Sequence, residues 1–205
     1  MNILAIGPHP DDIEIGCAGS LIKYARAGHA VFVLVLTSGD VGGDAVIRRK
    51  EAEASAQHMG VKQMFWGGFK DTELGADKAL ISRIEGVIKA TAPDMVLVNY
   101  SEDTHQDHRA SALATVSAAR YVKEVLFYEV PTTCNFDPKI YVDIGDVMEY
   151  KITALNLHAS QVDKTRVKDL TILESANASA MFRGFQGRVK YAEGFAPLRI
   201  LREIA

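Results

Sequence analysis

The chain has 205 residues, of which 48% are hydrophobic and 24% charged, and its formal net charge at pH 7 is −3. This length suits one α/β domain with a sizeable core, and we expect a single domain over residues 1–205. A slightly acidic chain lacks the basic field that binding to nucleic acid or to an anionic membrane needs. Neither kind of partner is therefore expected.

The sequence also indicates a cellular compartment. No apolar stretch approaches the roughly 18–20 residues of a membrane span, and the apolar start MNILAIG lacks the basic residues and cleavage site of a signal peptide. The two cysteines, Cys17 and Cys134, lie far apart in the sequence and favour two buried thiols over a disulfide. We therefore expect a cytoplasmic protein without a membrane span.

Up to Tyr128, short apolar runs alternate with segments of helical periodicity. Strands are expected at residues 2–6, 30–36, 61–66, 94–99 and 124–128, and helices at 17–27, 45–59, 78–91 and 108–121. Helices of ten or more residues between strands imply right-handed βαβ units and a mainly parallel sheet. The predicted fold class is α/β, a Rossmann-like three-layer sandwich with strand order 3-2-1-4-5.

The rhythm changes after Tyr128. Residues 139–143 are expected to add an edge strand, and residues 144–158 and 164–181 to form helices. The tail that begins at Arg183 is punctuated by glycine and gives no firm assignment. Because no repeat, low-complexity stretch or linker interrupts the chain, the edge strand and both helices are assigned to the same domain.

A first polar cluster, PHPDDIE at residues 8–14, directly follows the first strand. Two prolines of fixed φ hold a histidine and two carboxylates at the carboxyl end of a parallel strand, where open sheets bind ligands. Histidine and aspartate are good zinc ligands, and a second carboxylate beside a metal could act as a general base. Helix capping would be the favoured interpretation of one aspartate alone. Glu14 is expected to interact with the helix dipole rather than to catalyse.

A second cluster, HQDH at residues 105–108, follows the fourth strand and contains two of the six histidines. Three residues apart, the two imidazoles can face one side if the segment begins a helix. In the order 3-2-1-4-5, strands one and four are neighbours at the topological switch point, so the two clusters should face each other across a crevice. His158 is expected to be a structural histidine in that crevice.

Together these residues resemble the PIG-L/LmbE-like family of zinc-dependent N-acetylglucosaminyl deacetylases. Gln106 stands where the family pattern has proline, which should alter only the stiffness of the loop. The matching segments span nearly the whole chain: PHPDDIEIGCAGSL from Pro8, RRKEAEASAQHMGV from Arg48, HQDH from His105, HASQ from His158 and YAEGF from Tyr191.

The resemblance implies a ligand set and a base. His9, Asp12 and His108 correspond to the ligands of one Zn²⁺ per chain, with other divalent metals as alternatives. Asp11 corresponds to the general base that takes a proton from the attacking water.

The resemblance also implies residues that stabilise the reaction. His105 corresponds to the group that stabilises the developing oxyanion or donates a proton, with Asp107 orienting it. Arg48 falls where the family has an arginine near the active site, although a slip of one residue would bring Arg49 there instead.

The implied activity is hydrolysis of the N-acyl group, an acetyl, of an N-acetylglucosamine-type conjugate. The partner is then a small-molecule amino sugar, and small family members suggest a homo-oligomer. Two alternatives are a zinc amidase acting on another sugar-linked amide and a metal- or nucleotide-binding module without turnover. A pure binding module has no need of Asp11, which favours hydrolysis.

Overall fold

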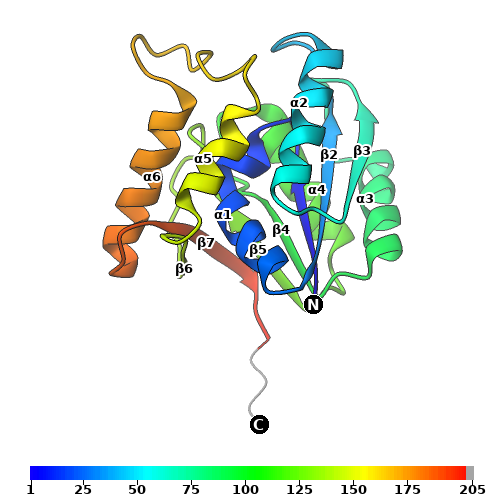
Figure 1. Ribbon diagram of the computed structural model, residues 1–205. Coiled ribbons are helices and arrows are strands. Elements are labelled where there is room, and N and C mark those ends of the chain that lie inside the picture. The colour runs from blue at the N-terminus through cyan, green and yellow to red at the C-terminus, as the bar shows by residue number, and fades with distance from the viewer. Residues whose placement is uncertain (202–205) are drawn as a thin grey trace.

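The five apolar runs expected as strands all join one sheet in the computed structural model, which describes residues 1–201 (Figure 1). They pair in parallel in the order β3-β2-β1-β4-β5, as predicted. Their carboxyl ends therefore meet at one edge, with β1 beside β4 at the switch point. The bounds are β1 (Asn2–Gly7), β2 (Ala30–Thr37), β3 (Gln63–Phe69), β4 (Met95–Asn99) and β5 (Glu124–Tyr128).

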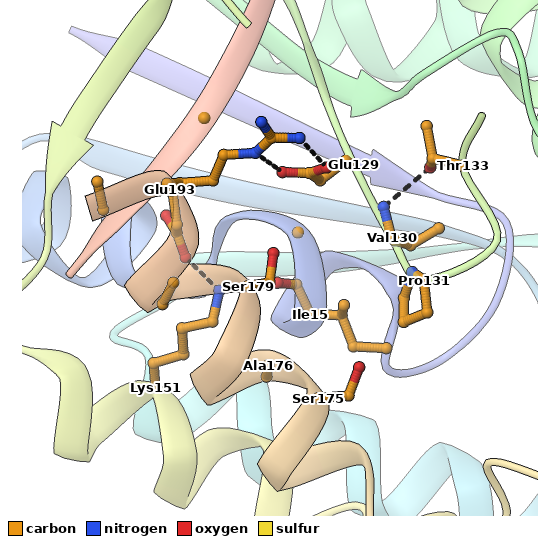
Figure 2. A pocket seen from close by; sticks show the side chains of 15 residues that line it. Ile15, Glu129, Val130, Pro131, Thr133, Lys151, Ser175, Ala176, Ser179 and Glu193 are labelled. Carbon is orange, nitrogen blue, oxygen red and sulfur yellow. Dashed lines mark hydrogen bonds and ion pairs between the residues drawn. The ribbon is translucent and has the colours of Figure 1, made fainter. Parts of the chain in front are cut away.

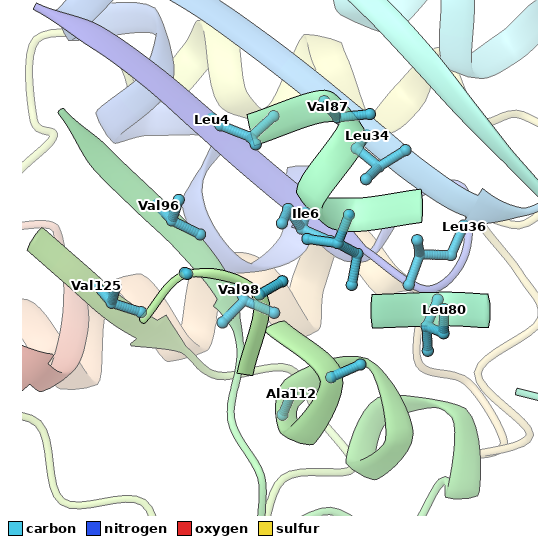
Figure 3. Packing of buried hydrophobic residues seen from close by; sticks show 14 of the residues in the cluster. Leu4, Ile6, Leu34, Leu36, Leu80, Val87, Val96, Val98, Ala112 and Val125 are labelled. Carbon is cyan, nitrogen blue, oxygen red and sulfur yellow. The ribbon is translucent and has the colours of Figure 1, made fainter. Parts of the chain in front are cut away.

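Helices cover both faces of this sheet. Leu4 and Ile6 of β1 share one apolar cluster with Leu80 of α3 (Figure 3). Ile3 and Ala5 point to the opposite face, because side chains alternate along a strand. Both faces are thus buried, which explains the uninterrupted apolar runs. The crossover helices are α1 (Asp12–Arg26) and α2 (Ala45–His58) on one face, and α3 (Lys78–Thr91) and α4 (Gln106–Ala118) on the other.

Helix α1 begins five residues earlier than expected, at Asp12 rather than Cys17. The apolar periodicity is clear only from Cys17 onward. The first turn instead carries Asp12 and Glu14, which suit the positive end of the helix dipole. The first polar cluster is therefore part loop and part helix.

The C-terminal part departs most from expectation. The sheet continues in the order β5-β7-β6, with β7 (Ala192–Arg199) antiparallel to both β5 and β6 (Ile140–Asp143). The edge position of β6 is confirmed, whereas β7 was not predicted. Gly194 and Pro197 interrupt its apolar pattern, and both residues are uncommon inside strands.

The two helices of the C-terminal part have bounds different from those expected. Helix α5 (Met148–Asn156) is shorter than residues 144–158, and α6 (Ile172–Gly187) replaces residues 164–181. Thr171 and Glu174 form a capping box that fixes the start of α6. Residues 157–171 consequently form an irregular segment between the two helices.

The expectations about cysteines and membrane spans fare differently. Cys17 and Cys134 are both free, and Cys17 is buried, but Cys134 is exposed in the loop that follows β5. The expectation of a buried thiol was therefore wrong for Cys134. Within residues 1–201, every helix is too short or too polar to cross a bilayer.

A buried ion pair fastens α1 to the C-terminal part of the chain. Lys151 Nζ of α5 donates to Glu193 Oε1 of β7 at 2.6 Å and to Ile15 O of α1 at 2.7 Å (Figure 2). The same carboxylate accepts the backbone N–H groups of Gly19 at 2.9 Å and Ser20 at 2.7 Å, in the middle of α1. The helix whose first turn carries the polar cluster is thus held by α5 and β7 together.

We expect Glu193→Gln to lower the free energy of unfolding by about 3–5 kcal/mol, because it leaves the Lys151 ammonium buried without a counter-charge. Asp137→Asn is a matched control, since Asp137 and Lys139 form an ion pair of the same 2.6 Å length. The side chains of that pair are 77% and 64% exposed, against 2% and 3% for Glu193 and Lys151. The control should lose at most about 1 kcal/mol. Equal losses in urea-unfolding experiments would contradict this assignment.

Candidate metal and catalytic site

A cleft of about 430 Å³ opens at the edge where the carboxyl ends of the parallel strands meet. Loops that follow all five parallel strands line it, together with the irregular segment between α5 and α6. Six of the seven residues singled out from the sequence line this cleft, and the seventh, Asp107, is buried. The six are His9, Asp11, Asp12, Arg48, His105 and His108.

The two loops expected to face each other do converge. Asp12 Oδ2 lies 3.1 Å from His9 Nδ1 and 3.4 Å from His108 Nε2, and all three side chains are buried. His9 follows β1 and His108 lies in the first turn of α4, so the pairing of β1 with β4 creates the cluster. The structure thus brings together the three residues that the family pattern assigns as metal ligands.

In both His9 and His108, carboxylates contact the ring nitrogen that does not face Asp12. His9 Nε2 lies 3.1 Å from Asp107 Oδ2 and 3.0 Å from Asp71 Oδ1. His108 Nδ1 lies 3.0 Å from Asp103 Oδ2. A carboxylate behind a ligating imidazole fixes its orientation and raises its basicity. His9 Nδ1 and His108 Nε2 are therefore the nitrogens turned toward Asp12.

This donor set fits a divalent cation. Two imidazoles and one carboxylate form a common protein ligand set for catalytic zinc, which leaves a coordination position open. The outer carboxylates supply the support that such ligands usually have. Among residues 1–201, two groups of three have ligand atoms that all lie within 4.8 Å of one another, and both include His9: one adds His105 and His108, the other Asp71 and Asp107.

The protonation of the cluster follows from its crowded carboxylates. Burial alone would lower the pKa of His108, but the charges of Asp12 and Asp103 outweigh it and raise that pKa to about 9. Burial is likewise outweighed at His9, whose pKa neighbouring carboxylates raise well above its usual value. Burial would raise the pKa of Asp12, yet the two imidazoles hold it well below its usual value. Without a cation, the cluster therefore holds protons.

Metal binding at pH 7 should consequently release about one proton or more per site. A cation binds the lone pair of a neutral imidazole, but His108 is protonated at pH 7 because its pKa is about 9. The apparent affinity of the metal-stripped protein for Zn²⁺ should rise as the pH rises toward that value. Calorimetry in buffers of different ionisation enthalpy measures the release. Above about pH 10 the contribution of His108 should disappear, and a binding enthalpy independent of buffer at pH 7 would contradict the prediction.

Asp11 occupies a strained backbone position beside the cluster. It is the N-cap residue of α1 with φ 91°, yet its side chain makes no capping hydrogen bond, so the capping interpretation does not account for it. A positive φ is costly outside glycine and persists where the surroundings impose it, often at functional sites. Burial, reinforced by the charge of Asp12, raises the pKa of Asp11 to about 6 against the opposing charge of Arg48.

Arg48, rather than its neighbour Arg49, faces this loop. Its buried guanidinium donates to Gly39 O at 2.7 Å and to Pro10 O at 2.8 Å. Gly39 has φ +66°, and a Cβ there would lie 2.2 Å from Arg48 Nη1, so glycine is required. Arg49 instead lies over the ring of Trp66, with 4.5 Å between the guanidinium carbon and the ring centroid. The possible slip of one residue in the family pattern is thereby excluded.

His105 and Asp107 are adjacent to the cluster in different ways. His105 is the N-cap residue of α4, where its Nδ1 accepts the backbone N–H of Asp107 at 3.2 Å. The Asp107 carboxylate contacts His9 and accepts the backbone N–H groups of Thr72 and Leu74. Burial and the charges of His9 and His108 lower the pKa of His105. Asp107 thus contacts His105 through its backbone and His9 through its side chain.

Two carboxylates of the site were missed in the sequence. Asp71 follows β3 at the same sheet edge, and its Oδ2 accepts the backbone N–H of Val41 at 2.9 Å. Asp103 follows β4, and its Oδ1 accepts the backbone N–H of His105 at 2.8 Å. Position after a parallel strand was the available signal, because it is the same signal that drew attention to the two histidine clusters.

Further polar groups connect the site with its surroundings. His158 Nε2 lies 3.1 Å from Glu14 Oε1, and both side chains are buried, so Glu14 pairs with the histidine that follows α5. A second pocket of about 170 Å³ adjoins the cleft and shares Ile15, Val130, Pro131 and Ser175 with it (Figure 2). Two ion pairs line that pocket, Lys151 with Glu193 and Arg183 with Glu129.

The protein is of the α/β class, with an open and mainly parallel sheet. A His/Asp cluster at the carboxyl edge of that sheet could hold a metal ion. Comparison with known families agrees with this class. The model of the PIG-L family, described as GlcNAc-PI de-N-acetylase, matches residues 4–119. The chain belongs to this family.

Individual relatives match over most of their length. The chain is 36% identical to the uncharacterized deacetylase YaiS of Escherichia coli over 78% of this chain and 91% of that protein. It is 31% identical to the diacetylchitobiose deacetylase of Thermococcus kodakarensis over 78% and 70% of the two proteins. Among solved structures, an N,N′-diacetylchitobiose deacetylase from Pyrococcus horikoshii superposes with a TM-score of 0.85 at 28% identity, covering 96% of this chain and 83% of that one.

Proposed function

We propose that this protein is a zinc-dependent amidohydrolase that removes the N-acetyl group from an N-acetylglucosamine-type conjugate. The relatives named as deacetylases support the reaction, and diacetylchitobiose, the substrate named for one of them, supports the amino-sugar class. The single observation that carries the proposal is a carboxylate, Asp11, beside the cluster of His9, Asp12 and His108 and free of any capping role.

An amide resists hydrolysis because its carbonyl is a weak electrophile and neutral water a weak nucleophile. A divalent cation held by His9, Asp12 and His108 would supply a Lewis acid and lower the pKa of water there. Asp11 accepts the proton of the attacking water. Its pKa of about 6 leaves it ionised at neutral pH and still basic enough to take that proton. Arg48 Nη2, 3.4 Å from Asp11 Oδ2, helps to hold the carboxylate.

His105 is assigned to the carbonyl oxygen of the substrate. Its Nδ1 accepts a backbone hydrogen bond, so the neutral ring carries its proton on Nε2. Its lowered pKa keeps the imidazole neutral at pH 7, and the side chain lines the cleft. A neutral Nε2–H can donate to the oxygen as negative charge develops on it. The proton held by Asp11 then passes to the departing amine.

The test is release of free amine and acetate from N-acetylglucosamine conjugates, measured before and after metal removal. We expect turnover by the metal-loaded protein, loss of turnover after chelation, and recovery on addition of about one equivalent of Zn²⁺ per chain. Parallel recovery experiments with Co²⁺, Mn²⁺ and Ni²⁺ compare the metals. Amine release that persists after metal analysis shows a stripped protein would refute the proposal, as would the absence of release from every conjugate by the loaded protein.

A further inference from the structure

The irregular segment that joins α5 to α6 comprises residues 157–171 (Figure 1). Several of its residues line the cleft, so it forms one wall of the site. Hydrogen bonds join it to helix α2 and to the loop that follows β2. Ser160 donates to Glu51 of α2 through its backbone N–H at 2.8 Å and its hydroxyl at 2.6 Å. Lys164 Nζ donates at 2.8 Å to Gly42 O, which belongs to the glycine-rich loop after β2 and also lines the cleft. These hydrogen bonds hold the segment in a defined position beside the cleft.

The charged residues of this wall that line the cleft are both cations. Lys164 and Arg166 line the cleft, whereas Asp163, Lys168 and Asp169 do not. Both acidic residues of the segment thus lie outside the lining, and the two charged residues that line it are cations. The chain as a whole has a net charge of −3, so general basicity does not explain a positive wall.

Arg166 is held in a defined turn of this segment. Thr165 Oγ1 accepts the backbone N–H of Val167 at 3.1 Å and donates to Leu170 O at 2.7 Å, which closes the turn. Arg166 has φ 59°, a left-handed conformation that is costly for a residue with a side chain. Within residues 1–201, its guanidinium makes neither a hydrogen bond nor an ion pair.

Other cations near the cleft are already committed. The guanidinium of Arg48 donates to the backbone around Asp11, and the two cations of the adjoining pocket are neutralised by glutamates. Lys164 uses one of its three N–H groups on Gly42, and Arg166 has all five of its own available. Lys164 and Arg166 both line the cleft, and an ammonium and a planar guanidinium are groups that bind the oxygens of a phosphate or carboxylate.

We propose that the substrate carries an anionic group, a phosphate or a carboxylate, attached to the N-acetylated sugar, and that Arg166 and Lys164 bind it at the rim of the cleft. This inference rests on the proposed function, because it takes the amide to lie at the His/Asp cluster. A cleft of about 430 Å³ is in the size range of sites for drug-sized ligands, which leaves room for a group beyond one sugar ring.

The test compares three probes that differ only at the anomeric substituent: N-acetylglucosamine 1-phosphate, the carboxymethyl glycoside and the neutral methyl glycoside of N-acetylglucosamine. The metal-loaded protein should prefer at least one anionic probe in kcat/KM by about tenfold or more. Arg166→Gln should reduce the ratio of anionic to neutral kcat/KM by about ten- to hundredfold, the expected loss of a charge-assisted contact. The preferred anion distinguishes phosphate from carboxylate.

Lys168→Gln is the matched control. It removes the same charge from the same segment at an exposed position outside the cleft lining, and it should leave the ratio within about twofold. Equal kcat/KM for all three probes in the unaltered protein would overturn the inference while leaving the proposed function intact. Equal effects of the two substitutions would also overturn it, because they would show a diffuse field instead of a contact.

Absence of turnover with all three probes would count against the proposed function but would not end the test. Calorimetric binding of the same probes to the metal-loaded protein should then still favour an anionic probe, and Arg166→Gln should remove that preference. Phosphate affinity that survives Arg166→Gln and disappears after chelation would show coordination to the metal, which overturns the role of Arg166.

Discussion

Asp11→Asn is expected to lower kcat for amine release by about 10²–10⁴-fold while the protein retains its metal. The amide has nearly the shape of the carboxylate but cannot accept the proton of the attacking water. Asparagine also tolerates the positive φ of 91° at this position better than alanine would, so the loop should keep its conformation. Loss of activity can therefore be attributed to the missing base.

Asp40→Asn supplies the control, because it makes the same chemical change in the loop after β2 at an exposed residue outside the cleft lining. Its kcat should stay within about twofold of the unaltered protein. Metal content of both variants is measured by elemental analysis. Full turnover by Asp11→Asn would remove Asp11 as the base and would require another group to accept the proton of the attacking water.

His108→Ala should weaken metal binding by more than about hundredfold, because removal of a partner behind a ligand already costs about 10- to 100-fold and the ligand itself should cost more. Asp103→Asn should fall in that smaller range, since Asp103 Oδ2 lies 3.0 Å from His108 Nδ1. Competition titration with a chromogenic chelator measures the metal affinity of both variants. The loss should be larger for His108→Ala, which removes a ligand, than for Asp103→Asn, which removes the carboxylate behind that ligand.

His29→Ala is a suitable control, because His29 precedes β2 at the opposite end of the sheet and contacts the N-terminus. It should bind metal as the unaltered protein does. Full occupancy in His108→Ala would show that the ligand set is different. The alternative group of His9, Asp71 and Asp107 would then be tested by the same titration on Asp71→Asn.

How far the fold was predictable depended on burial. The five parallel strands were found because strands buried on both faces carry uninterrupted apolar runs. β7 was missed because a glycine and a proline interrupt it and it pairs at both sides with partners distant in sequence. The start of α6 was misplaced because apolar periodicity was weighed above the capping box at Thr171.

The candidate site was predictable where topology and residue type coincide. The loops that carry His9 and His108 were brought together correctly by the rule for neighbouring strands at a switch point. Asp71 and Asp103 are single carboxylates without a motif, so only coordinates show that they support histidines. The division of Asp107 between His9 and His105 likewise depends on side-chain direction, which spacing does not determine.

The contact between Glu193 and α1 makes the site depend on the last strand of the chain, β7. Every residue assigned to the cation or to the reaction lies within the first 108 residues, whereas the carboxylate that accepts the mid-helix N–H groups of Gly19 and Ser20 belongs to the last strand, β7. A growing chain that already contains all the ligands therefore still lacks the Glu193 contact that holds α1, the helix that begins at Asp12. The site should therefore reach its final geometry only when β7 completes the sheet.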